Sequence, residues 1–180
     1  NNGVIRSVVA PGCGHYSRKQ TDELIEIAKH LGAKGLAFTK VEAGQLQGGI
    51  SKFLTEEEQK AILERTGAQD GDLILYASDS EKMANKVLAG IRNYFGSTLK
   101  LFNPDEFKLV WIKDFPLFDY NDDAKCWEPA HHMFTLPNED DIQYFESEAD
   151  YGKIRGQLYD LVCNGMELSS GSIRCHRYDI

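Results

Sequence analysis

The balance of charged residues changes abruptly at Asn103-Pro104, and this break most constrains how the chain can fold. Residues 1–103 carry 13 basic and 12 acidic side chains, net +1, whereas residues 104–180 carry 7 and 16, net −9. Aromatic residues divide 7 to 12 in the same direction, and both tryptophans lie in the second stretch. A composition change at an Asn-Pro pair is typical of a boundary between folding units. We predict two units, residues 1–103 and 104–180; the alternative is one domain with an acidic face.

The first stretch alternates between strand and helix patterns. Capping boxes at Ser17 and Thr55, each with Gln or Glu three residues later, predict the starts of two helices. The Gly- and Gln-rich residues 43–50 predict an exposed loop. Strands alternating with helices indicate a sheet covered by helices, of the α/β or α+β class. In order, the predicted strands and helices occupy residues 4–9, 17–32, 35–41, 55–66, 72–77 and 80–94.

The second stretch predicts a different organisation. A strand at 108–113 is followed by a turn at Asn121-Asp122-Asp123 between apolar flanks, which predicts a hairpin. The acidic residues 138–150 predict a surface helix or loop. Helical spacing of apolar residues predicts a helix over 152–162. Residues 166–176 alternate like a strand that Ser169-Ser170-Gly171 interrupts.

Composition also disfavours several classes of protein. A net charge of −8 argues against a free-standing nucleic-acid binder, and no apolar run approaches the roughly 18 residues of a membrane span. The four cysteines form no C-x-x-C pair, so we expect free thiols, a cytoplasmic location and no structural metal. Because the chain begins at Asn1 without Met, we expect it to be a piece of a longer protein.

Two clusters of residues could carry chemistry. His131 and His132 are adjacent, so in a strand only one of them would face a given pocket; a structural or surface pair is the alternative. Ser172, Arg174 and His176 share the two-residue spacing of a strand face, where an arginine can hold a carboxylate through two parallel hydrogen bonds.

Glu167 lies an odd number of residues before Arg174, so an unbroken strand would place the two on opposite faces. A bulge at Gly171 could restore a common face. The alternative is an exposed Glu167 and an ordinary ion-paired Arg174, which spacing alone favours.

Several motifs, in the same order along the chain, resemble bacterial-type aspartyl-tRNA synthetases. The first stretch resembles the GAD domain inserted in their catalytic region, and the second resembles the catalytic domain just after that insertion. The resemblance implies an α+β fold, a GAD module followed by part of a class II antiparallel catalytic sheet. The motifs are residues 32–37, 52–54, 65–72, 114–118, 130–135, 159–162 and 164–174.

The resemblance also implies roles for individual residues. His131 would help to close the pocket over L-aspartate, and Arg174 would bind its carboxylate. Glu167 would lie on the ATP side, where a carboxylate can hold Mg²⁺ against the phosphates. The remaining supporting positions of the pocket would be His132, Gly171 and Ser172.

Two departures from the family pattern concern this pocket. Met133 stands where the family usually has Pro, and Ser169-Ser170-Gly171 stands where it usually has three glycines. The serine side chains would narrow a pocket that a glycine backbone leaves open.

The implied activity is that of an aspartate–tRNA ligase. ATP and aspartate form aspartyl-adenylate, and the aspartyl group then passes to tRNA(Asp), in an enzyme expected to be a homodimer. The signature motifs of class II synthetases are absent from these residues, so the chain alone is expected to be inactive. The alternative is a non-catalytic GAD accessory module that contacts tRNA or braces a neighbouring domain, as in tRNA-dependent amidotransferase subunits.

Overall fold

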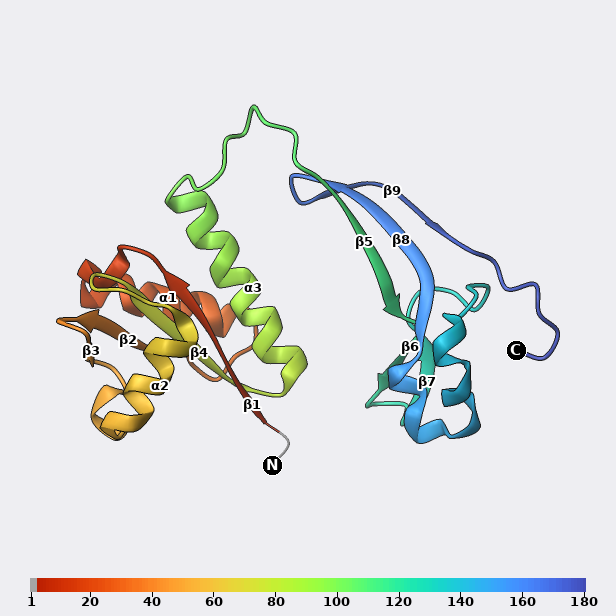
Figure 1. Cartoon of the computed structure of the whole chain (residues 1–180), viewed down its shortest axis with the longest axis horizontal. Helices are drawn as coiled ribbons and strands as arrows, with labels where there is room; N and C mark the ends of the chain where they lie inside the picture. Colours follow the sequence, from red (N-terminus) through yellow and green to blue (C-terminus); the bar gives the residue numbers. More distant parts are fainter. Residues whose placement is uncertain (1–2) are drawn as a thin grey trace. The chain divides into compact units, whose positions relative to one another are not determined.

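The computed structural model describes residues 3–180, which divide into two compact units (Figure 1). We call them unit 1, which ends at Asn103, and unit 2, which comprises Pro104–Ile180. Within residues 3–180, no helix has the length and apolar character needed to cross a membrane.

Unit 1 is built on a four-stranded sheet in the order β1-β4-β2-β3, and every neighbouring pair is antiparallel. The antiparallel pairing decides between the two predicted classes in favour of α+β. The elements are β1 (Val4–Ala10), η1 (Cys13–His15), α1 (Arg18–His30), β2 (Ala37–Glu42), β3 (Gln45–Gln47), η2 (Ser51–Phe53), α2 (Glu56–Thr66), β4 (Leu73–Asp79) and α3 (Glu81–Thr98).

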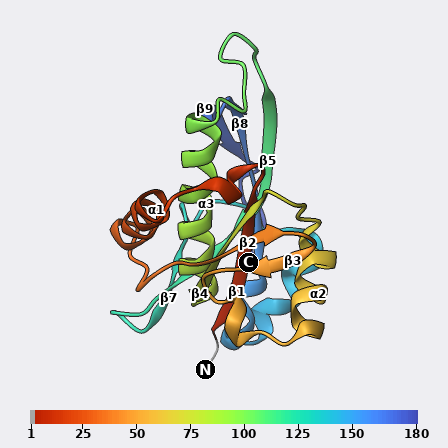
Figure 2. The same cartoon turned by 90° about the vertical axis from the view of Figure 1, so that its left-hand side faces the viewer.

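Helices cover both faces of this sheet. Helices α1 and α3 lie on one face and α2 lies on the other (Figure 2). Leu24 and Ile91 contribute to the larger core, which includes Leu73 and Leu75 of β4. All four side chains are at most 1% exposed, so unit 1 has a complete core of its own.

Both predicted capping boxes are confirmed. The side chains of Ser17 and Thr55 accept hydrogen bonds from the backbone N–H groups of Gln20 and Glu58, whose side chains accept from the cap residues in return. The predicted loop at residues 43–50 is wrong in part. It contains β3, which pairs with β2 and buries Leu46, so one apolar residue among glycines and glutamines suffices to hold an edge strand.

Unit 2 contains a three-stranded antiparallel sheet in the order β5-β8-β9 and a separate two-stranded hairpin. The hairpin, β6 paired with β7, confirms the turn predicted at Asn121. The predicted acidic segment forms two 3₁₀ helices. The elements are β5 (Leu109–Pro116), β6 (Phe118–Asn121), β7 (Cys126–Pro129), η3 (Glu139–Glu146), η4 (Glu148–Lys153), β8 (Arg155–Cys163) and β9 (Met166–Ser172).

The helix predicted over 152–162 is wrong, because most of this segment is β8, the central strand of the sheet. Its apolar residues Leu158 and Leu161 fit helical spacing. They lie instead on opposite faces of a strand that is hydrogen-bonded along both edges. A central strand with apolar groups on both faces lacks the two-residue alternation that identifies a strand from sequence.

The predicted interruption of the last strand at Ser169-Ser170-Gly171 is also wrong, because β9 runs through these residues without a break. The irregularity lies earlier: Ser169 pairs with Leu161 and Glu167 pairs with Val162, which leaves Leu168 as the extra residue. The bulge that the spacing argument required therefore exists, but at Leu168 rather than at Gly171.

The Asp141 carboxylate ties η3 to the start of β8. Its Oδ2 accepts from the backbone N–H of Arg155 at 2.9 Å and from Arg155 Nε at 2.8 Å, and its Oδ1 accepts from Arg155 Nη2 at 3.0 Å. Asp141 is only 4% exposed. The side-chain hydrogen bonds from Arg155 hold the pKa of Asp141 below its ordinary value. Folding therefore favours the charged form, which contributes stability above the ordinary pKa and loses it as pH falls through the lowered pKa.

We expect Asp141→Asn to lower the unfolding free energy of this chain at pH 7 by about 1 kcal/mol, a modest value because Arg155 is half-exposed. The loss of stability below about pH 4 should be shallower in the variant than in the wild type. Urea unfolding at pH 7 and pH 3 measures both, with the exposed turn residue Asp122→Asn as control. Parallel pH dependence in the wild type and Asp141→Asn would show that the carboxylate does not stabilise the fold.

Candidate functional site

The candidate site is a pocket of about 350 Å³ in unit 2. All six residues to which the resemblance gives a role line it. Four further residues also line it, and one of them, Asp160, is ionisable. The complete lining is Phe115, His131, His132, Leu158, Asp160, Glu167, Ser170, Gly171, Ser172 and Arg174.

The register of β8 and β9 explains how residues far apart in sequence meet here. Asp160 pairs with Ser170, and Leu158 pairs with Ser172, so these side chains share one face of the sheet. Because Leu168 is an extra residue, Glu167 pairs with Val162 and joins that same face. Both carboxylates therefore line the pocket that Arg174 also lines.

The expectation that only one histidine of the pair faces a pocket is wrong. His131 and His132 lie outside the strands, in a bend where side chains need not alternate between faces, and both line the pocket. The His131 ring lies edge-on to Phe115 of β5, with ring centroids 5.3 Å apart. His176, placed by spacing on the face of Ser172 and Arg174, does not line the pocket, because β9 ends at Ser172.

Arg174 is held by its backbone and leaves its charge available. It forms an isolated β-bridge with Thr135, which is 3% exposed. Its side chain contacts His132, with Nη1 2.8 Å from Nε2. Within residues 3–180, its guanidinium makes no ion pair with a carboxylate. The alternative of an ion-paired Arg174 is therefore wrong, whereas its other part, an exposed Glu167, is what the structure shows.

The carboxylates of Asp160 and Glu167 are likewise free of ion pairs in the described part of the chain. Unpaired charges of both signs in one pocket suit a ligand that itself carries both signs, or an anion together with a metal ion. No group of three or more His, Cys, Asp or Glu side chains converges to hold a metal among residues 3–180. Two carboxylates nevertheless fit Mg²⁺ bound to a nucleotide, because phosphates and water then complete its coordination.

Ser172 and Gly171 shape the floor of the pocket. Ser172 lines the pocket, and within residues 3–180 its buried hydroxyl has no hydrogen-bond partner. Ser170 also lines the pocket, as the departure from the family's glycine run implied, whereas Ser169 does not. A Cβ on Gly171 would lie 2.7 Å from Cε2, Cζ and Oη of Tyr159.

We expect Gly171→Ala to destabilise the chain by about 1 kcal/mol, because the Tyr159 ring must move away from the added methyl group. The effect is at the low end for overpacking because Tyr159 is 37% exposed and can shift toward solvent. Its edge contact with Trp111, at 6.0 Å between centroids, should weaken and change the tryptophan fluorescence. Ser169→Ala, on the same face of β9, is the matched control for urea unfolding. Equal stability and fluorescence in both variants would contradict this prediction.

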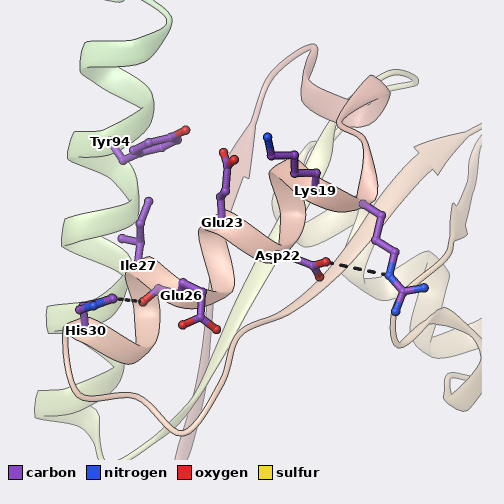
Figure 3. Close-up of a pocket in the computed structure, with 8 residues that line it drawn as sticks. Lys19, Asp22, Glu23, Glu26, Ile27, His30 and Tyr94 are labelled. Atoms are coloured by element: carbon purple, nitrogen blue, oxygen red, sulfur yellow. Dashed lines mark hydrogen bonds and ion pairs between the residues drawn. The ribbon is translucent and has the colours of Figure 1, made fainter.

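A larger hollow, of about 710 Å³, lies in unit 1 along α1 and beside Tyr94 of α3 (Figure 3). Several of its charged or polar groups have partners on their own helix. Arg18 Nε lies 4.0 Å from Asp22 Oδ2, and His30 Nδ1 lies 2.8 Å from the carbonyl oxygen of Glu26. Apart from Tyr94, the residues that line it all come from α1, whereas the pocket of unit 2 is lined by residues of β5, β8, β9 and the segments around His131 and Arg174.

Asp160 is the site residue that sequence reasoning missed. Asp160 lies two residues from both Leu158 and Val162, a spacing typical of one face of a strand. The spacing of Leu158 and Leu161 in the same segment instead favours a helix, and that prediction hid Asp160. With β8 recognised as a strand opposite the pocket residues of β9, Asp160 would have been a candidate.

Comparisons with known proteins agree with the motifs. Residues 1–88 match the family model of the GAD domain. The chain is 45% identical over 181 residues to an aspartate–tRNA(Asp/Asn) ligase of Treponema denticola and 44% identical over 178 residues to one of Geotalea uraniireducens. It is 39% identical over 175 residues to an aspartate–tRNA ligase of Ruminiclostridium cellulolyticum. These matches include 97–99% of this chain but only 29–30% of each relative. The resemblance found in the motifs is thereby confirmed.

Proposed function

We propose that this chain is an interior part of an aspartate–tRNA ligase, in which unit 2 supplies one wall of the site for aspartate and ATP. The observation that carries the proposal is the pocket lined by Arg174, Asp160 and Glu167, none of which forms an ion pair within residues 3–180. The identity to such ligases over nearly the whole chain supports it.

The positive and negative side chains of the pocket suit different parts of the two substrates. The guanidinium of Arg174 would bind the side-chain carboxylate of aspartate through two parallel hydrogen bonds. His131, whose ring packs on Phe115, would close the pocket over the amino acid. Glu167 and Asp160 would hold the Mg²⁺ that accompanies ATP, and this ion would neutralise charge on the phosphates.

The proposed reaction needs no covalent bond to the protein. An oxygen of the aspartate α-carboxylate attacks the α-phosphorus of ATP, and the bond from that phosphorus to pyrophosphate breaks. The adenylate then transfers its aspartyl group to the terminal adenosine of tRNA, and AMP leaves. The pocket residues act by positioning the two substrates and by balancing their charges.

The chain alone supplies an incomplete site under this proposal. The first four residues of β5 are large, apolar and exposed, two on each face: Leu109 62%, Val110 49%, Trp111 56% and Ile112 40%. A sheet with apolar groups on both faces is normally covered on both. The chain spans about 30% of the length of the curated relatives it matches, so the remainder of such a protein is long enough to provide the cover. The same proposal places the full-length protein in the cytoplasm as a homodimer.

Aminoacylation by the full-length protein tests this function. With ATP, Mg²⁺ and radiolabelled aspartate, we expect the label to become attached to tRNA(Asp), and no attachment by residues 1–180 alone. A parallel reaction with tRNA(Asn) distinguishes the two activities named among the relatives. Failure to charge either tRNA, in a preparation shown to be folded, would refute the proposal.

The second candidate is a non-catalytic role of the GAD module. The match over residues 1–88 and the separate core of unit 1 favour a module that acts by binding. Filter binding of tRNA(Asp) to this chain at low and moderate salt tests it, because phosphate contacts make affinity fall steeply with salt. Salt-sensitive binding would support tRNA contact, and its absence would leave bracing of a neighbouring domain.

A further inference from the structure

We infer that His132 is a positioning residue, whose imidazole holds one end of the Arg174 guanidinium so that the other end meets a carboxylate ligand. The inference rests on the proposed function, because it specifies how this pocket would orient the group that binds aspartate. His132 and Arg174 lie 42 residues apart, and no helix or strand carries His132.

The contact between the two side chains is short. Nη1 of Arg174 lies 2.8 Å from Nε2 of His132 and 3.3 Å from its Nδ1. A guanidinium can only donate, so the nearer ring nitrogen is the acceptor in this contact.

The other side of the imidazole is held by its own loop. The backbone N–H of Phe134 donates to Nδ1 at 3.3 Å, and the hydroxyl of Thr135 lies 3.3 Å from the same nitrogen. Thr135 is buried, and it also forms the β-bridge with Arg174. The ring is thus held between the segment Phe134–Thr135 on one side and the guanidinium on the other.

The surrounding backbone holds the two partners at a fixed separation. The N–H of Leu136 donates to the carbonyl of Ile173 at 2.8 Å, and the N–H of Cys175 donates to the carbonyl of Phe134 at 2.8 Å. These bonds flank Arg174 on both sides and join its segment to the one that follows His132. The side-chain contact then determines which rotamer the arginine adopts.

The contact uses only one nitrogen of the guanidinium. Within residues 3–180, Nε and Nη2 of Arg174 form no hydrogen bond. Together these two nitrogens form a planar edge that matches the two oxygens of a carboxylate. Holding Nη1 therefore reserves this edge for the ligand and lowers the entropy lost when the ligand binds.

Three substitutions at His132 in the full-length protein test the inference through aspartate-dependent exchange of pyrophosphate into ATP. His132→Ala, which removes the acceptor, should raise KM for aspartate about tenfold with a much smaller change in kcat. His132→Gln offers a neutral acceptor and should restore most of the affinity. His132→Lys places a second cation beside Arg174 and should raise KM further than His132→Ala. His176→Ala, outside the pocket, is the matched control, and thermal unfolding checks that each variant is folded.

A second measurement needs no activity. Phenylglyoxal modifies arginine side chains, and mass spectrometry of this chain can follow modification of Arg174 alone. We expect faster modification of Arg174 in His132→Ala than in the wild type or His132→Gln. Equal rates, or an unchanged KM in His132→Ala, would overturn the positioning role. Absence of aspartate-dependent exchange in the wild type would instead count against the proposed function, while the modification rates would still decide the inference.

Discussion

Replacing Arg174 by alanine in the full-length protein is expected to lower kcat/KM for aspartate by about 30-fold to 4,000-fold. The range corresponds to the 2–5 kcal/mol lost when one partner of a buried charge pair is removed, because under the proposed function the ligand and the rest of the full-length protein cover Arg174, which is exposed in this chain. The loss should be large because Arg174 is the pocket's only guanidinium and has no carboxylate partner in the described structure other than the proposed ligand. Exchange of pyrophosphate into ATP, measured over a range of aspartate concentrations, gives kcat/KM directly.

Arg174→Lys separates charge from geometry. Lysine keeps the positive charge but cannot form two parallel hydrogen bonds, so it should recover only a small part of the lost activity. Ser169→Ala, on β9 but outside the pocket lining, is the control for changes to this strand. Unchanged kcat/KM in a folded Arg174→Ala variant would remove Arg174 from the site.

Removing the pocket carboxylates is expected to produce the second large effect, of a different kind. Glu167→Gln and Asp160→Asn should each lower kcat by about 100-fold, comparable to the loss of one group that stabilises charge in a transition state. Both should raise the Mg²⁺ concentration needed for half-maximal exchange, because amide side chains bind Mg²⁺ less well than carboxylates. KM for aspartate should change little, in contrast to the variants of Arg174 and His132.

The pair also tests whether Asp160 shares the role of Glu167. The two lie on one face of the sheet, on neighbouring strands, so we expect similar Mg²⁺ dependence in both variants. Glu148→Gln, on η4 and outside the pocket, is the control for loss of one negative charge. A normal Mg²⁺ requirement in Glu167→Gln would exclude this residue from the metal side of the pocket.

Local signals in the sequence predict unit 1 well. The capping boxes at Ser17 and Thr55 depend on residues three positions apart, so the sequence alone is enough to locate them. The same holds for the hairpin around Asn121, whose turn residues lie between short apolar flanks. The order of the strands in the sheet, by contrast, depends on contacts between distant segments and could not be derived from local patterns.

The geometry of the pocket could be predicted only in part from local sequence patterns. The spacing of Glu167 and Arg174 correctly indicated that a bulge is needed to bring both to one face of the sheet. Because glycine is common at bulges, Gly171 was the expected position, but the extra residue is Leu168. Asp160 was missed because β8, as a central strand, lacks the alternation of an exposed one. The His132–Arg174 contact is a tertiary contact between residues 42 positions apart, which no local periodicity predicts.

The most direct test of the account is the amino-acid dependence of ATP–pyrophosphate exchange by the full-length protein, with the twenty standard amino acids supplied one at a time. If the pocket around Arg174 binds the side-chain carboxylate of aspartate, aspartate should support exchange. Asparagine, which lacks the carboxylate, and glutamate, whose side chain is one methylene longer, should not. Exchange supported equally by asparagine, or by another amino acid in place of aspartate, would contradict the assignment of this pocket.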